Sequence, residues 1–273
     1  MATIEERIMC KAKELGADLV GITDIASLQN SPSHLLLSSV GDKIDGEYSH
    51  SNKTEFYKVV WPENAKSVLV IGLSHPQNKP ELDWKISNGG TPGNSTLINI
   101  NKKLSKWIEE MEHVKTHPMH YYVEKGGIYL KDAAVLAGLG CIGKNNLLIT
   151  PEFESKIRLR GMLLEAALES TGSIKFDPCN NCPEYCRKSC PQEAFGAKVA
   201  FPNYSIMNTL PARDAFYKRS RCLFQMNADR EVLGALTHGE TAGGMDTGTI
   251  QKTILTGVKH CRQCELVCPV EPM

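Results

Sequence analysis

Eight of the ten cysteines in this 273-residue chain fall into two closely spaced groups, and their spacing constrains the fold more than any other feature. The groups read Cys179-x2-Cys182-x3-Cys186-x3-Cys190-Pro191 and Cys222, then Cys261-x2-Cys264-x3-Cys268-Pro269. A 4Fe–4S cube needs four thiolates around a compact centre, and one loop with such short spacings can supply three of them. The pattern therefore predicts two 4Fe–4S clusters that carry electrons.

The cysteine that precedes proline decides how the two groups share their ligands. In the bacterial two-cluster pattern this cysteine reaches across to the other cluster. Applied to this chain, the crossing assigns every cysteine of the two groups to a cluster. One set is Cys179, Cys182, Cys186 and Cys268, and the other is Cys222, Cys261, Cys264 and Cys190. The sequence departs from the usual spacing between Cys182 and Cys186, where three residues replace two.

Structural zinc is the alternative to iron–sulfur clusters, because two C-x2-C pairs can also supply a four-thiolate site. Four cysteines crowded into residues 179–190, and two terminal C-x3-C-P units, favour clusters instead. Cys10 and Cys141 fall outside the pattern. Cys10 lies beside the apolar face of an expected helix, which predicts a buried structural thiol.

The composition excludes several other classes of protein. Lys and Arg number 31, as do Asp and Glu, so no overall positive field is available to hold nucleic acid or an anionic membrane. No apolar run approaches the ~20 residues of a membrane span, and acidic residues stand where a secretory signal needs a basic start. We expect a cytoplasmic protein without membrane contact, whose cysteines bind metal rather than form disulfides.

Helices and strands alternate through the first ~170 residues. Thr3 and Glu6 form a capping-box pattern before a helix that ends near Gly16. We expect further helices at 100–111 and 129–137, and strands at 19–22, 67–73, 121–123, 147–150 and 157–164. Residues 76–95, rich in Pro, Gly, Asn and Ser, and the histidine-containing stretch 112–120 are expected to be loops.

The character of the chain changes near residues 171–177, where cysteines and turn residues replace the alternating elements. We therefore expect two domains. An α/β layered cofactor and substrate domain spans residues 1–174, and a two-cluster domain like bacterial ferredoxins spans 175–273. The overall class is α+β.

A glycine motif, Gly138-Leu-Gly140-Cys-Ile-Gly143, fits the G-x-G-x-x-G pattern of dinucleotide-binding folds. In those folds the motif follows a strand and starts a helix, whereas here a helix is expected before it and a strand after it. We therefore expect a tight helix-to-strand turn that closely approaches a ligand or another part of the backbone.

The stretch Tyr129-Leu-Lys-Asp132-Ala-Ala-Val-Leu-Ala-Gly-Leu-Gly-Cys-Ile-Gly-Lys-Asn145 resembles the helix and AGLGxIGKN turn of epoxyqueuosine reductases. The similarity continues through residues 158–164 and both cysteine groups, and more weakly through 14–22. Epoxyqueuosine reductases share their catalytic core with reductive dehalogenases. The resemblance covers most of the chain from ~10 to 270.

This resemblance implies an α/β domain of nitroreductase-like type that binds cobalamin, joined to the two-cluster module. The clusters would pass electrons from an external ferredoxin or flavodoxin to a base-off cobalamin, which reduces a small-molecule or tRNA-nucleoside substrate. Asp132 corresponds to the family's proton donor. The resemblance also implies that Gly138, Gly140 and Gly143 let the backbone approach the corrin, and that Lys144 and Asn145 bond its amides or the substrate.

Two departures bear on the substrate and cofactor. Family members carry a basic Tyr-His motif where this chain reads Asn94-Ser-Thr-Leu-Ile-Asn-Ile-Asn101, and they continue beyond the last cysteines into a helical-repeat region. Two other functions stay open: an electron-transfer protein without cobalamin, and a reductive activator of a corrinoid on another protein. For Asp132 the alternative is a solvated carboxylate on a helix surface. The sequence leaves the substrate, donor and oligomeric state open.

Overall fold

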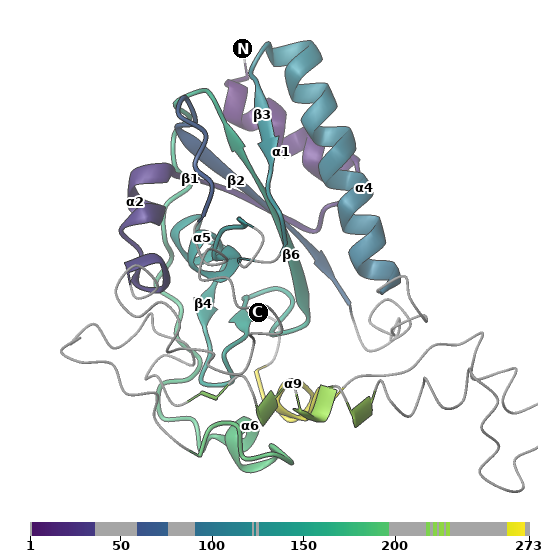
Figure 1. Cartoon of the computed structure of the whole chain (residues 1–273), viewed down its shortest axis with the longest axis vertical. Coiled ribbons are helices and arrows are strands. Elements are labelled where there is room, and N and C mark those ends of the chain that lie inside the picture. Colours follow the sequence, from purple (N-terminus) through teal and green to yellow (C-terminus); the bar gives the residue numbers. More distant parts are fainter. Residues whose placement is uncertain are drawn as a thin grey trace, which may run out of the picture.

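A four-stranded antiparallel sheet forms the centre of the chain (Figure 1). The computed structural model describes residues 2–35, 59–75, 91–121, 123, 126–196, 217–218, 221–222, 224–226, 228–229 and 261–270. The strands are β1 (Leu19–Asp24), β2 (Ser67–Ser74), β3 (Thr116–Pro118) and β6 (Ile157–Leu164). They lie in the order β1-β2-β6-β3, and each neighbouring pair is antiparallel.

Helices cover both faces of this sheet (Figure 1). Helices α1 (Ile4–Glu14) and α4 (Pro92–Trp107) pack on one face, and α2 (Ile25–Gln29) and α5 (Leu130–Leu136) on the other. Because side chains alternate along a strand, Leu69 and Ile71 of β2 join the first core and Val68 and Val70 the second. The predicted layers are confirmed, in a mixed α/β fold whose sheet is antiparallel.

The helix starts follow from local capping. In α1 the predicted capping box is present: Glu6 N–H donates to Thr3 Oγ1 at 3.2 Å, and Thr3 N–H donates to Glu6 Oε2 at 2.9 Å. The expected loop through residue 95 is wrong at its end, because α4 begins at Pro92. Thr91 caps this helix by accepting a bond from Asn94 N–H at 3.2 Å, and proline suits the first helical turn.

The segment after α4 also differs from the expectation. A π-helical turn (η3, Ile108–Glu112) extends α4, and β3 then pairs with the edge of β6. The strand expected at 121–123 is therefore wrong for its described residues, and residues 116–118 of the expected histidine loop form a strand instead. His117 Nε2 lies 2.9 Å from Glu165 Oε1, because β3 pairs with the end of β6 and so brings these two residues together.

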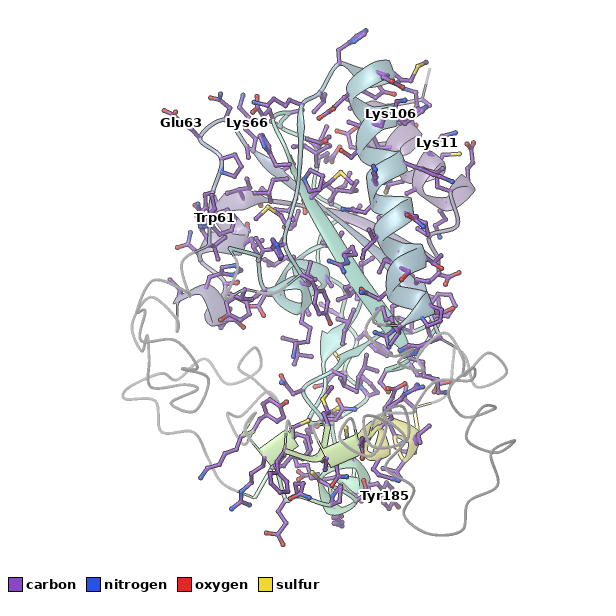
Figure 2. The ribbon with its side chains drawn as sticks, turned by 45° about the vertical axis from the view of Figure 1, so that its right-hand side comes forward. Lys11, Trp61, Glu63, Lys66, Lys106 and Tyr185 are labelled. Atoms are coloured by element: carbon purple, nitrogen blue, oxygen red, sulfur yellow. The ribbon has the colours of Figure 1, made fainter. Side chains whose placement is uncertain are left out.

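The cysteine-rich segments lie at one end of the layers. A small hairpin of β4 (Cys141–Ile142) and β5 (Leu148–Ile149) leads toward α6 (Tyr185–Lys188) and α9 (Gln263–Leu266), which pack together. Figure 2 shows Tyr185 at this end and Lys106 at the opposite end of the molecule. The chain thus brings two cysteine segments far apart in sequence to one place.

Two smaller expectations concern single features. Cys10 is exposed and its thiol donates to Glu14 Oε1 at 3.8 Å, so the prediction of a buried thiol is wrong. It lies on the side of α1 opposite the buried residues Ile8 and Ala12. Within the described residues, no helix has the length and apolar character needed to span a membrane.

Candidate metal centre

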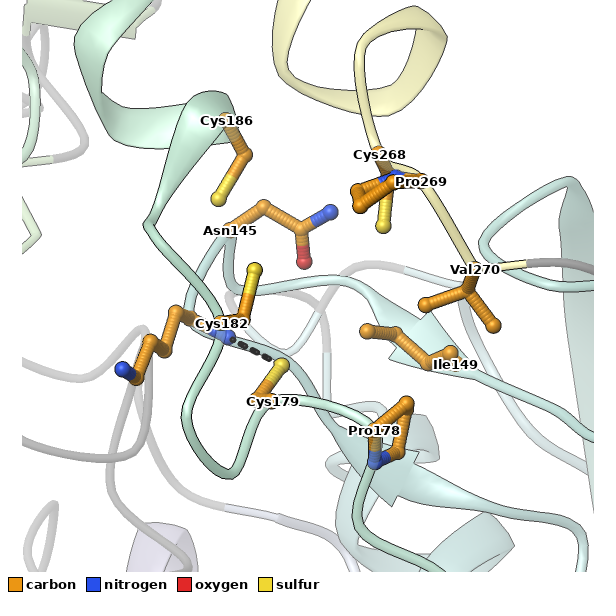
Figure 3. Close-up of a pocket in the computed structure, with 10 residues that line it drawn as sticks. Asn145, Ile149, Pro178, Cys179, Cys182, Cys186, Cys268, Pro269 and Val270 are labelled. Atoms are coloured by element: carbon orange, nitrogen blue, oxygen red, sulfur yellow. Dashed lines mark hydrogen bonds between the residues drawn. The ribbon is translucent and has the colours of Figure 1, made fainter.

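Four cysteines from two distant segments line one pocket (Figure 3). Cys179 and Cys182 precede α6, Cys186 lies within it, and Cys268 follows α9. The turn before α6 is held by two backbone donors: Cys179 N–H bonds Asp177 Oδ1 at 3.1 Å, and Cys182 N–H bonds Cys179 O at 3.3 Å. These four thiols are the set that the crossing rule assigns to one cluster.

Burial disfavours the ionised form of these thiols. Burial, together with the neighbouring thiols of Cys268 and Cys179, raises the pKa of Cys186 to about 11. The pKa of Cys268 is raised chiefly by burial too, with Cys179 among the contributing neighbours. Several thiolates crowded in a buried pocket require compensating positive charge, which bound iron supplies. The site is therefore suited to a cationic group.

The thiols do not converge as ligands of a single ion would. Among the described side chains, no three histidine, cysteine or acidic groups surround one position that a metal ion could occupy. Zinc holds its thiolates about 2.3 Å from one centre, whereas the thiolates of a four-iron cluster come from around a larger body. A site for one zinc ion and a site for a four-iron cluster therefore differ in how closely their thiolates approach a common centre.

The second group of cysteines lies beside the first. Burial raises the pKa of Cys264, and the thiols of Cys222, Cys186 and Cys261 raise it further, so these groups are neighbours. Cys190 accepts a hydrogen bond at Sγ from the N–H of Ala194 at 3.3 Å. The structure thus brings Cys222, Cys261 and Cys264 together, and the place of Cys190 as their fourth partner stays a prediction.

Asp229 supports this second group and was missed in the sequence. Its Oδ2 accepts a bond from Cys261 N–H at 2.7 Å, and its Oδ1 accepts one from Gln225 Nε2 at 3.0 Å. Asp229 precedes Cys261 by 32 residues, and no local motif links the two positions. Only the fold reveals the contact.

The glycine motif forms the predicted tight turn between α5 and β4. A Cβ at Gly138 would lie 2.2 Å from Gly172 O, and one at Gly140 would lie 2.0 Å from Ile149 O. Both glycines have positive φ, 73° and 154°. The chain's own backbone thus accounts for glycine at these two positions, and approach to a corrin at Gly138, Gly140 and Gly143 stays a prediction.

Lys144 and Asn145 lie against the four-thiol pocket. The backbone N–H of Lys144 donates to Cys179 Sγ at 3.5 Å, and its side chain pairs with Glu184 Oε1 at 2.8 Å. Asn145 Nδ2 donates to Cys264 O at 3.3 Å. These two residues, expected from the resemblance to contact a corrin or a substrate, contact both cysteine groups.

Asp132 is buried, so the alternative of a solvated helical carboxylate is wrong. It lies in the first turn of α5, 5% exposed, and accepts bonds from Ser33 N–H at 3.0 Å and Ser33 Oγ–H at 2.7 Å. Burial raises the pKa of Asp132, while the bonds from Ser33 oppose that rise. The carboxyl joins α5 to the segment that follows α2 and retains its proton more readily than an exposed aspartate.

His34 lies beside this carboxyl and was also missed. Its Nδ1 is 2.8 Å from Ser31 Oγ, its Nε2 accepts from Tyr129 N–H at 3.4 Å, and its ring packs 5.5 Å from that of Trp61. Burial lowers the pKa of His34 to about 4, so the ring is neutral at pH 7. The Ser-Pro-Ser-His sequence gives no sign of the burial, because Tyr129 and Trp61 come from other segments.

A second buried polar group joins the sheet to α9. His75, at the end of β2, lies 3.7 Å from Glu265 Oε1, and Arg262 pairs with the same carboxylate. His75 is 5% and Glu265 7% exposed. Because burial and the nearby positive charges lower the pKa of His75 to about 3, the ring acts as a neutral partner. These residues fix the position of the segment that carries Cys261 and Cys264.

The chain is similar to several curated reductases. No protein-family model matches it. It is 22% identical to the epoxyqueuosine reductase of Lactococcus garvieae over 98% of this chain and 70% of the relative. It is 30% identical to the epoxyqueuosine reductase of Gloeobacter violaceus over 71% of this chain and 61% of the relative. The chain is therefore similar to the epoxyqueuosine reductase family along most of its length.

Solved structures of this family share the fold. The epoxyqueuosine reductase of Streptococcus thermophilus matches with a TM-score of 0.60 and 24% identity, over 98% of this chain and 66% of that one. A reductive dehalogenase matches with a TM-score of 0.53 and 15% identity, over 81% of this chain and 29% of that one. The chain spans 70% of the Lactococcus garvieae relative and 51% of the Bacillus subtilis one.

Proposed function

We propose that the chain is an iron–sulfur, cobalamin-dependent reductase that resembles epoxyqueuosine reductase. Two 4Fe–4S clusters would carry electrons from an external ferredoxin or flavodoxin to a base-off cobalamin, which reduces a small or nucleoside-type substrate. The observation that carries the proposal is the pocket of four thiols, Cys179, Cys182, Cys186 and Cys268, drawn from both cysteine groups. A 4Fe–4S cluster that carries electrons needs four thiolates brought together in this way.

The cluster part of the proposal is supported by the chain's own residues. The four thiols are brought together by α6 and α9, and the N–H of Lys144 lies beside Cys179 Sγ. Hydrogen bonds to cluster sulfurs are among the factors that set cluster potential. In this chain the α/β layers supply such a donor, so the part expected to hold the substrate lies against the first set of thiols.

The cobalamin part rests on the family. The similar reductive dehalogenase is described with a mechanism for B12-dependent dehalogenation, and one epoxyqueuosine reductase has been solved with an epoxyqueuosine-modified tRNA stem loop. Cobalamin, when bound, supplies a metal centre that accepts single electrons, while the protein supplies position and protons. A tRNA nucleoside is therefore the first substrate to test, and a free small molecule the second.

Asp132 is proposed as the proton source. It is buried, holds a proton more readily than an exposed aspartate, and precedes the glycine turn at the end of α5. In one structure of the Bacillus subtilis enzyme, a catalytic aspartate loop is swung out of the active site. Glu124 is a second carboxylate in the segment between β3 and α5 and lies outside the described residues. It is the matched alternative to Asp132.

The first experiment is anaerobic purification with iron, sulfide and hydroxocobalamin, followed by metal analysis and a visible spectrum. We expect ~8 irons per chain, as two cubes require, together with one cobalt and corrin bands that change on reduction. Iron without retained corrin would replace the proposal with an electron carrier or a reductive activator. Zinc in place of iron would overturn the cluster assignment itself.

The proton source is tested next, with Asp132→Asn and Glu124→Gln compared in the loaded protein. The residue that supplies the proton loses substrate turnover by about 10²-fold or more when it becomes an amide, while its iron content and corrin spectrum stay unchanged. Turnover unchanged in Asp132→Asn would remove Asp132 from the reaction. Its buried carboxylate would then serve only to join α5 to Ser33.

A further inference from the structure

Asn145 lies between the two cysteine groups and contacts both of them. Its side chain lines the pocket formed by Cys179, Cys182, Cys186 and Cys268, and it is only 3% exposed (Figure 3). The same side chain bonds the backbone of Cys264, which belongs to the second predicted set. One buried amide therefore contacts the surroundings of both expected clusters.

The orientation of this amide is fixed by two bonds. Leu147 N–H donates to Asn145 Oδ1 at 3.1 Å, which leaves Nδ2 to donate to Cys264 O at 3.3 Å. Gly143 makes room for this arrangement, since a Cβ there would lie 2.5 Å from Asn145 Oδ1. The network decides which end of the amide is nitrogen, so a donor, not an acceptor, faces the segment of Cys264.

The preceding residue binds the other cysteine segment. Lys144 N–H donates to Cys179 Sγ at 3.5 Å, and Lys144 O accepts a bond from Arg187 Nε at 3.0 Å. The Lys144 side chain pairs with Glu184 before α6. Consecutive residues of one turn thus bind the first segment through Lys144 and the second through Asn145.

We infer that Asn145 is a positioning residue that holds the two cysteine segments, and the clusters that they would bind, in register. The inference rests on the proposed pair of clusters but not on cobalamin or on any substrate. The amide is neutral, so a carboxylate in its place would add negative charge beside the thiols and disfavour the more negative, reduced state of a nearby cluster. The bond to Cys264 O keeps the second segment at a fixed place beside that cluster.

Asn145→Asp is the sharpest variant. It has the same shape and can still accept the bond from Leu147 N–H, but it replaces the donor to Cys264 O with a negative oxygen. Asn146→Asp is the matched control, because Asn146 Oδ1 already accepts a bond from Lys131 Nζ at 2.9 Å and an added charge there meets that ammonium. Asparagine and aspartate both tolerate the φ of 59° at this position.

The measurement is an anaerobic redox titration followed by electron paramagnetic resonance, without cobalamin or substrate. We expect Asn145→Asp to keep ~8 irons per chain, to shift the midpoint of one cluster to lower potential, and to change the magnetic interaction between the two reduced clusters. Asn146→Asp should match the wild-type protein in all three. If Asn145→Asp fails to assemble clusters, Asn145→Ala supplies the same comparison without a buried charge.

The outcomes separate this inference from the proposed function. Two clusters in the wild-type protein with unchanged potentials in both Asn145 variants would overturn the role of Asn145 alone. Equal shifts in Asn145→Asp and Asn146→Asp would also overturn it, since any nearby charge would then have the same effect. A wild-type protein that binds no cluster would overturn both.

Discussion

The layered region buries two continuous apolar cores, one on each face of the sheet, whereas the described part of the cysteine-rich region buries few apolar side chains. Between residues 177 and 196 the buried apolar side chains are Cys179, Cys186, Ala194 and Phe195. Its helices α6 and α9 have four residues each, and a helix of that length has little stability of its own. The comparison teaches that the layered region folds on side-chain packing, whereas the described part of the cysteine-rich region has few apolar side chains to pack.

Removing one cluster ligand should give the largest effect. Cys186→Ser is expected to lose one cluster, about half of the ~8 irons per chain, because serine is a poor substitute for a thiolate at iron. The loss should also raise hydrogen exchange throughout residues 177–196 while β2 and β6 stay protected. Iron analysis and exchange mass spectrometry measure the two effects.

Cys141→Ser is the matched control for this experiment. Cys141 lies outside both cysteine groups, on β4, and its replacement should leave the iron content unchanged. Full iron in Cys186→Ser, or an equal loss in both variants, would contradict the division into a packed and a cluster-dependent region.

A core substitution tests the other side of the comparison. Ile71 is fully buried on β2, so Ile71→Ala should lower the free energy of unfolding of the layered region by about 2–5 kcal/mol. The exchange protection of β2 should fall, with the iron content preserved in protein that remains folded. Met111→Ala, at a side chain that is 62% exposed, should change stability by less than about 0.5 kcal/mol.

Chemical denaturation measures both variants. An equal destabilisation by Ile71→Ala and Met111→Ala would mean that the buried face of β2 is not the source of stability. Iron lost from folded Ile71→Ala would mean that the two regions do not stabilise themselves separately.

The sequence predicted the layered region well because its signals are local. Thr3 and Glu6 marked the start of α1, and the apolar run at 67–73 marked the central strand β2. The short strand β3 was missed, since it exists only by pairing with the edge of β6. A three-residue strand has no periodicity of its own.

The thiols of the site were predicted from the sequence, whereas the residues that support the site were missed. The spacing of the cysteines and the crossing rule gave the set that lines the pocket. By contrast, Ser33, His34, His75 and Asp229 act through partners between 32 and 187 residues away, and only the fold brings these together. Lys144 and Asn145 were selected from the motif, and their contacts with the cysteine segments were not foreseen, while their contact with a corrin stays a prediction.

The turn that joins the two regions should be sensitive to a single methyl group. Gly140→Ala would place a Cβ 2.0 Å from Ile149 O, which forces β4 and β5 apart. The substitution should lower the free energy of unfolding by about 2–4 kcal/mol. Gly172→Ala is the control, because it has a positive φ of 74° but no atom within 4 Å of the added carbon. It should cost only about 1 kcal/mol.

Thermal unfolding and iron content together measure this pair. Because Lys144 and Asn145 follow the same turn, Gly140→Ala should also lower the iron content, and Gly172→Ala should not. Equal costs in the two variants would show that positive φ alone, rather than the close approach to Ile149, requires glycine at position 140.

The smallest effect concerns pH and tests whether the layered region carries its own acid sensitivity. Burial lowers the pKa of His34 to about 4, so the folded state favours the neutral ring more than the unfolded state does. The stability from this burial is complete above the unfolded pKa of about 6.5 and is lost as pH falls toward 4. Glutamine does not titrate, so the free energy of unfolding of His34→Gln should fall by about 1–2 kcal/mol less than that of the wild-type protein across this pH range.

The measurement is urea denaturation of the layered region at several pH values between 7 and 4, with His120→Gln as the control at an exposed histidine. His120→Gln should follow the wild-type curve. Because the ring of His34 packs against Trp61 and Tyr129, His34→Gln should be less stable than the wild-type protein at pH 7 and approach it as the pH falls. Parallel curves for His34→Gln and the wild-type protein would mean that protonation of His34 is not the source of the acid sensitivity.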